Sequence, residues 1–245
     1  MDPTLCRRTP LRAESRKTVI SSDRYYVDTL AASRLEACYM IAPPRVQQYL
    51  DAEVAHVMAR IRPGDRVLDL GCGYGRVMGS LAEKADCAVG IDTSIPSLRR
   101  RIELLGGVPR AYGAAMDALH LGFRAEAFDT VVCIQNGISA FHVDQRALVE
   151  EALRVVRPGG RVLFSTYAAR FWPHRLQWFE LQAQAGLIGA IDSKQTGDGV
   201  IVCKDGFTAT TVSPARFAEL TTGLPASVAI EEVDGSSLFC ELVRA

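Results

Sequence analysis

The apolar residues of this chain recur with two different periods. Between Arg45 and Ile61 they return every three or four positions, which is the spacing of a helix that buries one face. Other runs are short, apolar throughout and bounded by turn residues, and these predict buried strands. They lie at 66–70, 87–91, 129–134 and 161–166. Because helical patterns separate these runs, we predict an α/β fold with a mostly parallel sheet and helices on both faces.

Capping and turn residues mark the ends of the predicted helices. A proline pair precedes the first helix, and a Pro-Gly pair follows it. Ser94 followed by Pro96 is typical of a helix N-terminus. Asp144 stands where it can cap a further helix that runs to about Val156. These signals make the alternation of strands and helices regular as far as residue 166.

The pattern changes after Tyr167. A helical segment rich in aromatic residues comes first. Three short β-like runs follow at Val200–Lys204, Phe207–Val212 and Ser237–Val243. We expect these runs to complete the sheet with antiparallel strands.

No internal repeat and no low-complexity linker divides the chain, which favours one domain with appendages. We expect residues 1–20 to form a flexible tail and residues 21–62 an N-terminal helical lid. Residues 63–245 then form the core. Within the core, a substrate cover rich in aromatic residues begins at about residue 167.

Composition and charge exclude several classes of function. The chain has 28 Lys and Arg against 28 Asp and Glu, so its net charge is zero and it offers no generic cationic surface for nucleic acid. No apolar run approaches the roughly 18 residues that suggest a membrane span. The seven cysteines are scattered without a Cys-x-x-Cys pair, which disfavours structural zinc and a disulfide framework. We therefore expect a cytoplasmic protein with no metal, no nucleic-acid partner and no membrane partner.

Three glycines follow the first predicted strand, at the edge where parallel sheets bind ligands. Gly71, Gly73 and Gly75 permit positive φ and leave room for a ligand beside backbone amides. Asp92 ends the next strand, where a carboxylate can accept both hydroxyl groups of a ribose. A dinucleotide fingerprint needs a third glycine at position 76, which is Arg76, so the pyrophosphate-binding form is not met. The pattern favours a nucleotide-like pocket over a plain glycine-rich turn.

These residues resemble the motifs of a known family. Asp69–Gly75 is similar to motif I of the class I S-adenosylmethionine-dependent methyltransferases, and Asp92 matches their ribose-binding acid. Phe128–Val132 resembles the strand-four motif, and Leu153–Gly160 resembles the helix-to-strand turn that follows this motif. The resemblance covers about residues 45–166, roughly half the chain. It implies a Rossmann-like seven-stranded sheet with one antiparallel strand, with S-adenosyl-L-methionine over the glycine loop and S-adenosyl-L-homocysteine as product.

The resemblance also implies a set of cofactor-binding residues at this edge of the sheet. They are Asp69, Gly71, Cys72, Gly73, Asp92, Thr93, Met116, Asp117 and Gln135. The chain departs from the family where adenine is read, because the place of the acidic residue falls on Ala115. Either Asp117 supplies the carboxylate from a shifted backbone, or backbone groups and the packing of Met116 hold the adenine. Arg45 either pairs with the cofactor carboxylate or opens its helix beside solvent.

Methyl transfer from a sulfonium is an in-line displacement that mainly needs alignment and the exclusion of water. A base helps only an acceptor that is not already nucleophilic. His142, beyond the loop after the fourth strand, is the candidate base, and the alternative is a loop histidine near a helix N-terminus. Tyr26 and Tyr39 are also candidate catalytic residues, because their rings attract a cationic sulfonium. The candidate substrate-binding residues are Asn136, Tyr167 and Trp172.

The sequence therefore predicts S-adenosylmethionine-dependent methyl transfer to a small molecule by a monomer or homodimer. The acceptor atom stays open among O, N, C and S. One alternative is a thiol or metalloid (arsenic-type) methyltransferase, since Cys38 and Cys72 flank the predicted site. Another is a non-catalytic protein that binds or senses S-adenosylmethionine, because both functions need the same glycine loop.

Overall fold

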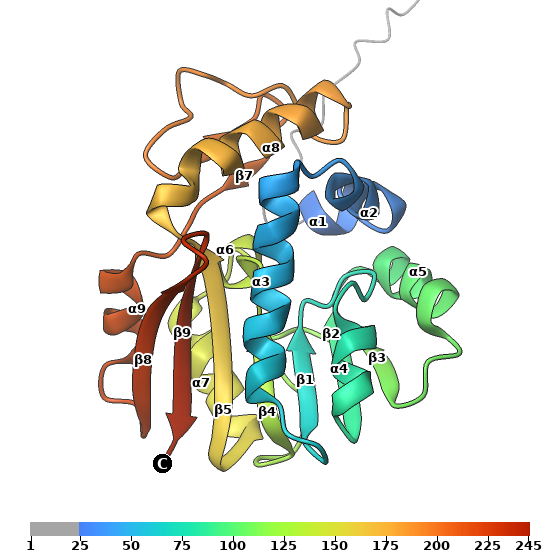
Figure 1. The fold of residues 1–245 in the computed structure, drawn as a ribbon, viewed down its shortest axis with the longest axis vertical. Coiled ribbons are helices and arrows are strands. Elements are labelled where there is room, and N and C mark those ends of the chain that lie inside the picture. Colours follow the sequence, from blue (N-terminus) through green and yellow to red (C-terminus); the bar gives the residue numbers. More distant parts are fainter. Residues whose placement is uncertain (1–24) are drawn as a thin grey trace, which may run out of the picture.

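The computed structural model describes residues 25–245, and its frame is a seven-stranded sheet in the order β3-β2-β1-β4-β5-β9-β8 (Figure 1). The strands are β1 (Arg66–Leu70), β2 (Cys87–Asp92), β3 (Ala111–Ala115), β4 (Phe128–Cys133), β5 (Val156–Tyr167), β8 (Ala226–Val233) and β9 (Ser237–Arg244). Strands β1 to β5 are parallel, whereas β9 is antiparallel to both of its neighbours. The strand order reverses between β1 and β4, and such a reversal opens a crevice at the carboxyl ends of the strands.

Helices cover both faces of this sheet and build a separate core on each (Figure 1). On one face lie α3 (Pro44–Arg60), α4 (Met78–Lys84) and α5 (Ile95–Leu105), and on the other α7 (Gln145–Val155) and α9 (Pro214–Thr221). Successive strand residues point to opposite faces, so Val131 packs in the α7 core and Val132 in the α3 core. Both valines are fully buried. The fold class predicted from the sequence is confirmed.

A third group of elements lies beyond the carboxyl ends of the strands (Figure 1). Its members are α1 (Tyr25–Asp28), α2 (Ser33–Met40), the 3-10 turn η2 (Ala169–Phe171), α8 (Trp172–Gln184) and the small sheet of β6 (Ile201–Val202) and β7 (Thr208–Ala209). Trp178 Nε1 donates to the Cys38 carbonyl at 2.8 Å, and the Tyr25 hydroxyl donates to Asp205 at 2.5 Å. The N-terminal helices and the segment after β5 are therefore packed against each other. The expected tail and residues 21–24 of the expected lid lie outside the described residues.

Two helix caps predicted from the sequence are present in the structure. Ser94 accepts a hydrogen bond from the Ser97 amide at the start of α5, and Asp144 accepts one from the Ala147 amide at the start of α7. Each cap satisfies an amide that lacks a partner inside its helix. This local chemistry explains why the boundaries of both helices could be predicted.

The prediction for the C-terminal strands was wrong in two of three cases. The run Ser237–Val243 joins the sheet as β9, but the other two runs contribute only β6 and β7, which pair with each other. The sheet is completed instead by β3 and β8, which were not predicted. These are its two edge strands; β3 consists mainly of Ala and Gly, and β8 is largely exposed, so neither has the apolar pattern of a buried strand.

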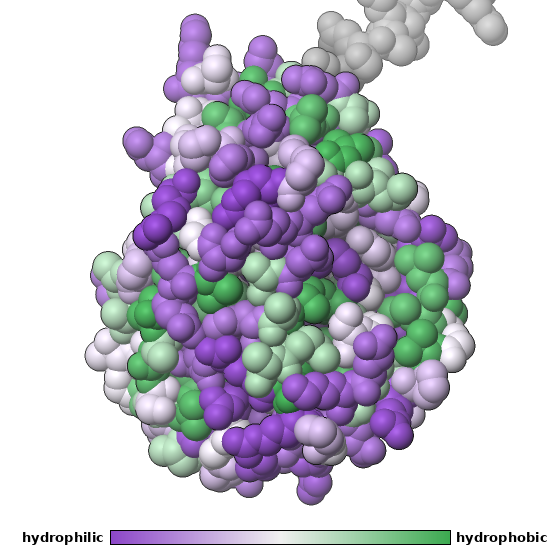
Figure 2. Space-filling model, viewed as in Figure 1, coloured by the Kyte–Doolittle hydropathy of each residue, from purple (hydrophilic) through white to green (hydrophobic). Residues whose placement is uncertain are grey.

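Two surface properties bear on partners. None of the helices in residues 25–245 is long and apolar enough to cross a membrane. On the face shown in Figure 2, polar and apolar side chains are interspersed across the described part of the chain.

We predict that Leu163→Ala lowers the free energy of unfolding by about 2–5 kcal/mol, the usual cost of emptying a fully buried leucine site. Leu163 lies in the middle of β5 and is 0% exposed. Leu104→Ala on α5 is the matched control, because this leucine is 43% exposed and should change stability by no more than about 0.5 kcal/mol. Chemical denaturation of both variants measures the difference, and equal effects would contradict the assigned core.

Candidate functional site

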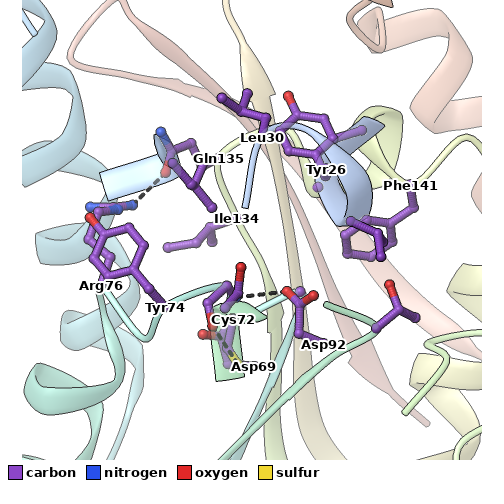
Figure 3. Close-up of a pocket in the computed structure, with 18 of the residues that line it drawn as sticks. Tyr26, Leu30, Asp69, Cys72, Tyr74, Arg76, Asp92, Ile134, Gln135 and Phe141 are labelled. Atoms are coloured by element: carbon purple, nitrogen blue, oxygen red, sulfur yellow. Dashed lines mark hydrogen bonds between the residues drawn. The ribbon is translucent and has the colours of Figure 1, made fainter. Parts of the chain in front are cut away.

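A cavity of about 430 Å³ lies at the carboxyl ends of β1, β2 and β4 (Figure 3). The glycine turn after β1 and the end of β2 form its floor. The loops after β3 and β4, the end of β5, and helices α1, α2 and α8 contribute the remaining walls. The cavity is thus at the crevice that the strand order opens.

The turn after β1 depends on glycine for both conformation and space. Gly71, Gly73 and Gly75 have φ of 74°, 54° and 87°, values that residues with a side chain rarely adopt. A Cβ atom on Gly71 would also lie 2.5 Å from the ring of Phe141. At Gly71 and Gly73 the turn therefore presents its backbone to the cavity.

Asp92 is held in place by the turn that it faces (Figure 3). Its Oδ2 accepts the Gly73 amide at 2.8 Å, and its Oδ1 accepts the Ser94 amide at 2.7 Å. Burial raises the pKa of this carboxyl, and the backbone amides act in the opposite direction. Since each carboxylate oxygen has two acceptor positions, both oxygens can still accept a hydroxyl group from a ligand.

Asp69 brings a buried acid to the same end of the cavity. It is 3% exposed, and no described residue gives its Oδ2 a hydrogen bond. Burial raises the pKa of this carboxyl to about 7, although the nearby Arg76 lowers it. A buried acceptor without a partner is suited to a cationic ligand group such as an ammonium.

Arg76 is a site residue that the sequence reasoning missed. Among the residues that the structure describes, it is the one arginine that lines the cavity. Its Nη2 donates to Gln135 Oε1 at 2.8 Å, and its guanidinium lies 5.1 Å from the ring centroid of Tyr39. The available signal was its place directly after the glycine loop. Arg45, considered earlier for a carboxylate, instead pairs with Asp234 at 2.7 Å.

The loop after β4 is held in an unfavourable backbone conformation. Gln135, Asn136 and His142 have φ of 55°, 65° and 53°, and they flank the short helix α6 (Gly137–Ala140). Such residues cost of order 1–3 kcal/mol each and persist where surrounding contacts hold them, often at functional sites. Gln135 and His142 line the cavity.

Asn136 does not line the cavity with them. Its side-chain amide donates to the Thr210 carbonyl at 2.9 Å, and its Oδ1 accepts the Thr166 hydroxyl at 2.7 Å. The side chain is 5% exposed and ties the loop to β5 and to the segment after β7. The structure thus places Asn136 behind the site rather than in it.

A second missed residue, Glu53, supports the same loop from α3. Its Oε1 accepts the Ser165 hydroxyl at 2.6 Å and the Ser237 hydroxyl at 3.0 Å. Ser165 in turn accepts the Gln135 amide at 2.7 Å. Glu53 is fully buried, and burial raises its pKa. The signal in the sequence was an acidic residue within the apolar face of the first helix.

Aromatic side chains of α1, α2, α8 and the end of β5 form one wall of the cavity. They are Tyr26, Tyr39, Tyr167, Trp178 and Phe179. Two further rings on the lining, Tyr74 and Phe141, lie in and beside the glycine turn. Burial raises the pKa of Tyr26, Tyr39 and Tyr167, so these hydroxyl groups stay protonated at neutral pH. Trp172 lies outside the lining, because it packs at the start of α8, with Arg175 5.7 Å from its ring centroid.

The remaining predicted residues lie on the lining as well. They are Cys72, Thr93, Met116 and Asp117. Asp117 is at the rim with its side chain 53% exposed, and its oxygens accept the Leu119 amide at 2.9 Å and contact His120 at 3.3 Å. Both ways of holding an adenine, through Asp117 or through the packing of Met116, remain predictions.

Comparison with known proteins points to the same region of the chain. Residues 67–160 match a family model described as a methyltransferase domain. A 2-methyl-6-phytyl-1,4-hydroquinone methyltransferase from Synechocystis sp. is 31% identical over 137 residues, which are 52% of this chain and 42% of that protein. A ubiquinone biosynthesis O-methyltransferase from Paracidovorax citrulli is 36% identical over 107 residues, 42% of this chain and 44% of that protein. The chain spans about half the length, or less, of the curated relatives it matches.

Solved structures share the fold over a larger part of the chain. The PH0226 protein from Pyrococcus horikoshii OT3 aligns with a TM-score of 0.62 at 21% identity, covering 91% of this chain and 96% of that one. The DhpI-SAM-HEP complex aligns with a TM-score of 0.59 at 22% identity, covering 86% of this chain and 92% of that one. At these identities the likeness concerns the fold.

We predict that Asp69→Asn raises the thermal midpoint of the ligand-free protein by a few degrees at pH 8 and by much less at pH 5. The native pKa of about 7 lies above the unfolded value near 3.9, so the unfolded chain loses its proton first as the pH rises. The native state therefore loses stability between about pH 4 and pH 7, and the cost is complete above pH 7. Asparagine carries no charge and avoids this cost.

Thermal unfolding followed by circular dichroism at the two pH values measures this difference. Asp117→Asn is the matched control, because half of that side chain is in water. Equal changes at pH 5 and pH 8 for Asp69→Asn would show that Asp69 has an ordinary pKa.

Proposed function

The chain belongs to the class I methyltransferase family through its domain at residues 67–160, and from this premise we propose that it transfers a methyl group from S-adenosyl-L-methionine to a small molecule. The single observation that carries the proposal is the carboxylate of Asp92, fixed by the Gly73 amide at the end of β2. A ribose diol fits this acceptor, which keeps free acceptor positions on both oxygens.

Other side chains at the same end of the cavity as Asp92 complement the remaining parts of an adenosyl amino acid. Asp69 offers an unpaired buried oxygen to an ammonium, and Arg76 offers a guanidinium to a carboxylate. Met116 and Asp117 lie on the lining where an adenine would be held. When bound, this cofactor supplies a methyl group on a positively charged sulfur. The residues of the chain align the acceptor with that methyl group and exclude water.

The cavity itself favours a small acceptor. Its volume is about 430 Å³, and helices α1, α2 and α8 reach over it from two distant parts of the chain. Pockets of roughly 300–1,000 Å³ are typical for small molecules and cofactors. The names of the two curated relatives, one acting on a hydroquinone and one in ubiquinone biosynthesis, support an aromatic acceptor without identifying it.

The two alternatives have less support. A thiol or metalloid chemistry needs thiolates, but burial raises the pKa of Cys38 to about 12 and also raises that of Cys72. Among residues 25–245 no group of three metal-binding side chains comes together. A sensing protein would bind the cofactor without turnover, and transfer of a labelled methyl group to phenols, amines and thiols tests that alternative directly.

Asp92→Ala is predicted to weaken the binding of S-adenosyl-L-methionine by about 1.5–3 kcal/mol, the range for hydrogen bonds to a charged group. Asp86→Ala, at the opposite end of β2 and exposed, should leave the affinity unchanged. Isothermal titration calorimetry of the two variants measures the contrast. Unchanged binding in Asp92→Ala, or binding of NAD in place of the sulfonium compound, would refute the proposal.

We further propose that His142 accepts a proton from a protonated acceptor. His142→Ala should then lower kcat about 10²–10⁴-fold at a pH where the acceptor is protonated, and far less at a pH where it is already ionised. Rates with one phenol measured from pH 6 to pH 10 give this comparison. A loss that is the same at every pH would assign His142 a structural role.

A further inference from the structure

Arg175 lies buried directly behind the aromatic wall of the cavity. It belongs to α8 and is 1% exposed. Its guanidinium carbon lies 4.6 Å from the ring centroid of Tyr167 and 5.5 Å from that of Phe179. Both rings also line the cavity, so a single layer of side chains separates this cation from a bound molecule.

The charge of Arg175 is not balanced by a described carboxylate. Its Nη1 donates to the Gly199 carbonyl at 2.6 Å and its Nη2 to the Ala209 carbonyl at 3.0 Å, whereas its Nε is buried without a partner. None of the ion pairs found among residues 25–245 includes it. Carbonyl groups stabilise the guanidinium but carry no net charge, so the site keeps a positive potential. Burying a cation without a counterion costs free energy of folding. A residue that is kept at this cost is a candidate for a functional role.

The other charged groups that face the cavity lie elsewhere. Asp69, Asp92 and Arg76 are at the proposed cofactor end, Asp117 is at the rim, and His142 is on the loop after β4. The wall made by α1, α2, α8 and the end of β5 consists of aromatic, aliphatic, Cys and Gln side chains. Two charged groups lie behind this part of the lining. Arg175 lowers the pKa of Tyr167, and the buried Glu53 raises it more weakly.

Two hydroxyl groups in the wall already respond to this charge. Burial raises the pKa of Tyr26 and Tyr167, and Arg175 lowers both in opposition. A ligand packed against the far side of such a ring lies roughly 8 Å from the guanidinium. At an effective dielectric constant of about 20, a cation at that distance lowers the pKa of an acidic ligand group by roughly 1.5.

We propose that the acceptor is a flat aromatic molecule with an acidic hydroxyl group, and that Arg175 stabilises its ionised form. The proposal rests on the proposed methyl transfer and names its acceptor class. The hydroxyl proton passes to His142 or to solvent. The phenolate oxygen then bonds the methyl carbon, and the bond from that carbon to sulfur breaks with its electron pair left on sulfur. The negative oxygen and the positive sulfur both become neutral, so the charges balance.

The test uses 4-nitrophenol, whose ionised form has its own visible absorption band. A spectroscopic pH titration of the probe with excess full-length protein and S-adenosyl-L-homocysteine should give a pKa about 1.5 below the value in buffer. By linkage, the ionised probe then binds about thirtyfold more tightly than the neutral one. 4-Nitroanisole, which cannot ionise, is the matched ligand and should bind with no dependence on pH. A raised or unchanged pKa, or no binding of 4-nitrophenol at millimolar concentration, would overturn the proposal.

Variants of Arg175 separate the charge from its packing. Arg175→Gln should abolish the pKa shift of the probe, and Arg175→Lys should keep most of it. Arg170→Gln is the control, since that side chain is 70% exposed and should leave the shift intact. If circular dichroism shows that Arg175→Gln does not fold, the titration of the wild-type protein still shows whether the pKa of the probe is lowered or raised. Failure of the proposed function would appear separately, as a loss of S-adenosyl-L-methionine binding in calorimetry.

Discussion

The site depends on the hydrogen bond between the Gly73 amide and the Asp92 carboxylate, 2.8 Å long. Parallel pairing of β1 and β2 aligns Leu70 with Ile91, so the turn that follows one strand meets the acid that ends the other. The close approach also requires Gly90, because a Cβ atom there would lie 2.7 Å from the Cys72 sulfur. The strand register, the turn and the orientation of the carboxylate are thus one constraint, and the cavity is built around it.

Several features of the site oppose folding on their own. Asp69 is a buried acid with an unpaired oxygen, and Gln135, Asn136 and His142 have positive φ. Such costs are borne where surrounding contacts leave no alternative. The rigid elements here are the two cores of the sheet and the bonds from Glu53 through Ser165 to the strained loop. The two cores of the sheet therefore supply the stability that the unfavourable conformations and the buried acid of the site reduce.

The cover of the cavity comes from two distant segments of the described chain. Helices α1 and α2 meet α8 and the β6–β7 hairpin, joined by contacts such as that of Trp178 with the Cys38 carbonyl (Figure 1). Arg175 holds the hairpin through main-chain carbonyls and at the same time places a cation behind the aromatic wall. One residue therefore both assembles the cover and sets the charge felt by a ligand beneath it. Arg175 thus contributes both to the enclosure of the cavity and to the electrostatic potential at its aromatic wall.

The sequence by itself determined the α/β class, the capped helices and the glycine turn with Asp92, because each of these is encoded by residues close together in the chain. It did not reveal the edge strands β3 and β8, whose exposed residues lack the pattern of burial. Arg76 meets Gln135 across 59 positions and Glu53 meets Ser165 across 112, and neither contact has a local signal. Asn136 and Trp172 have suitable chemistry, but neither side chain lines the cavity. Only the tertiary structure decided these, since packing between distant segments sets where a side chain points.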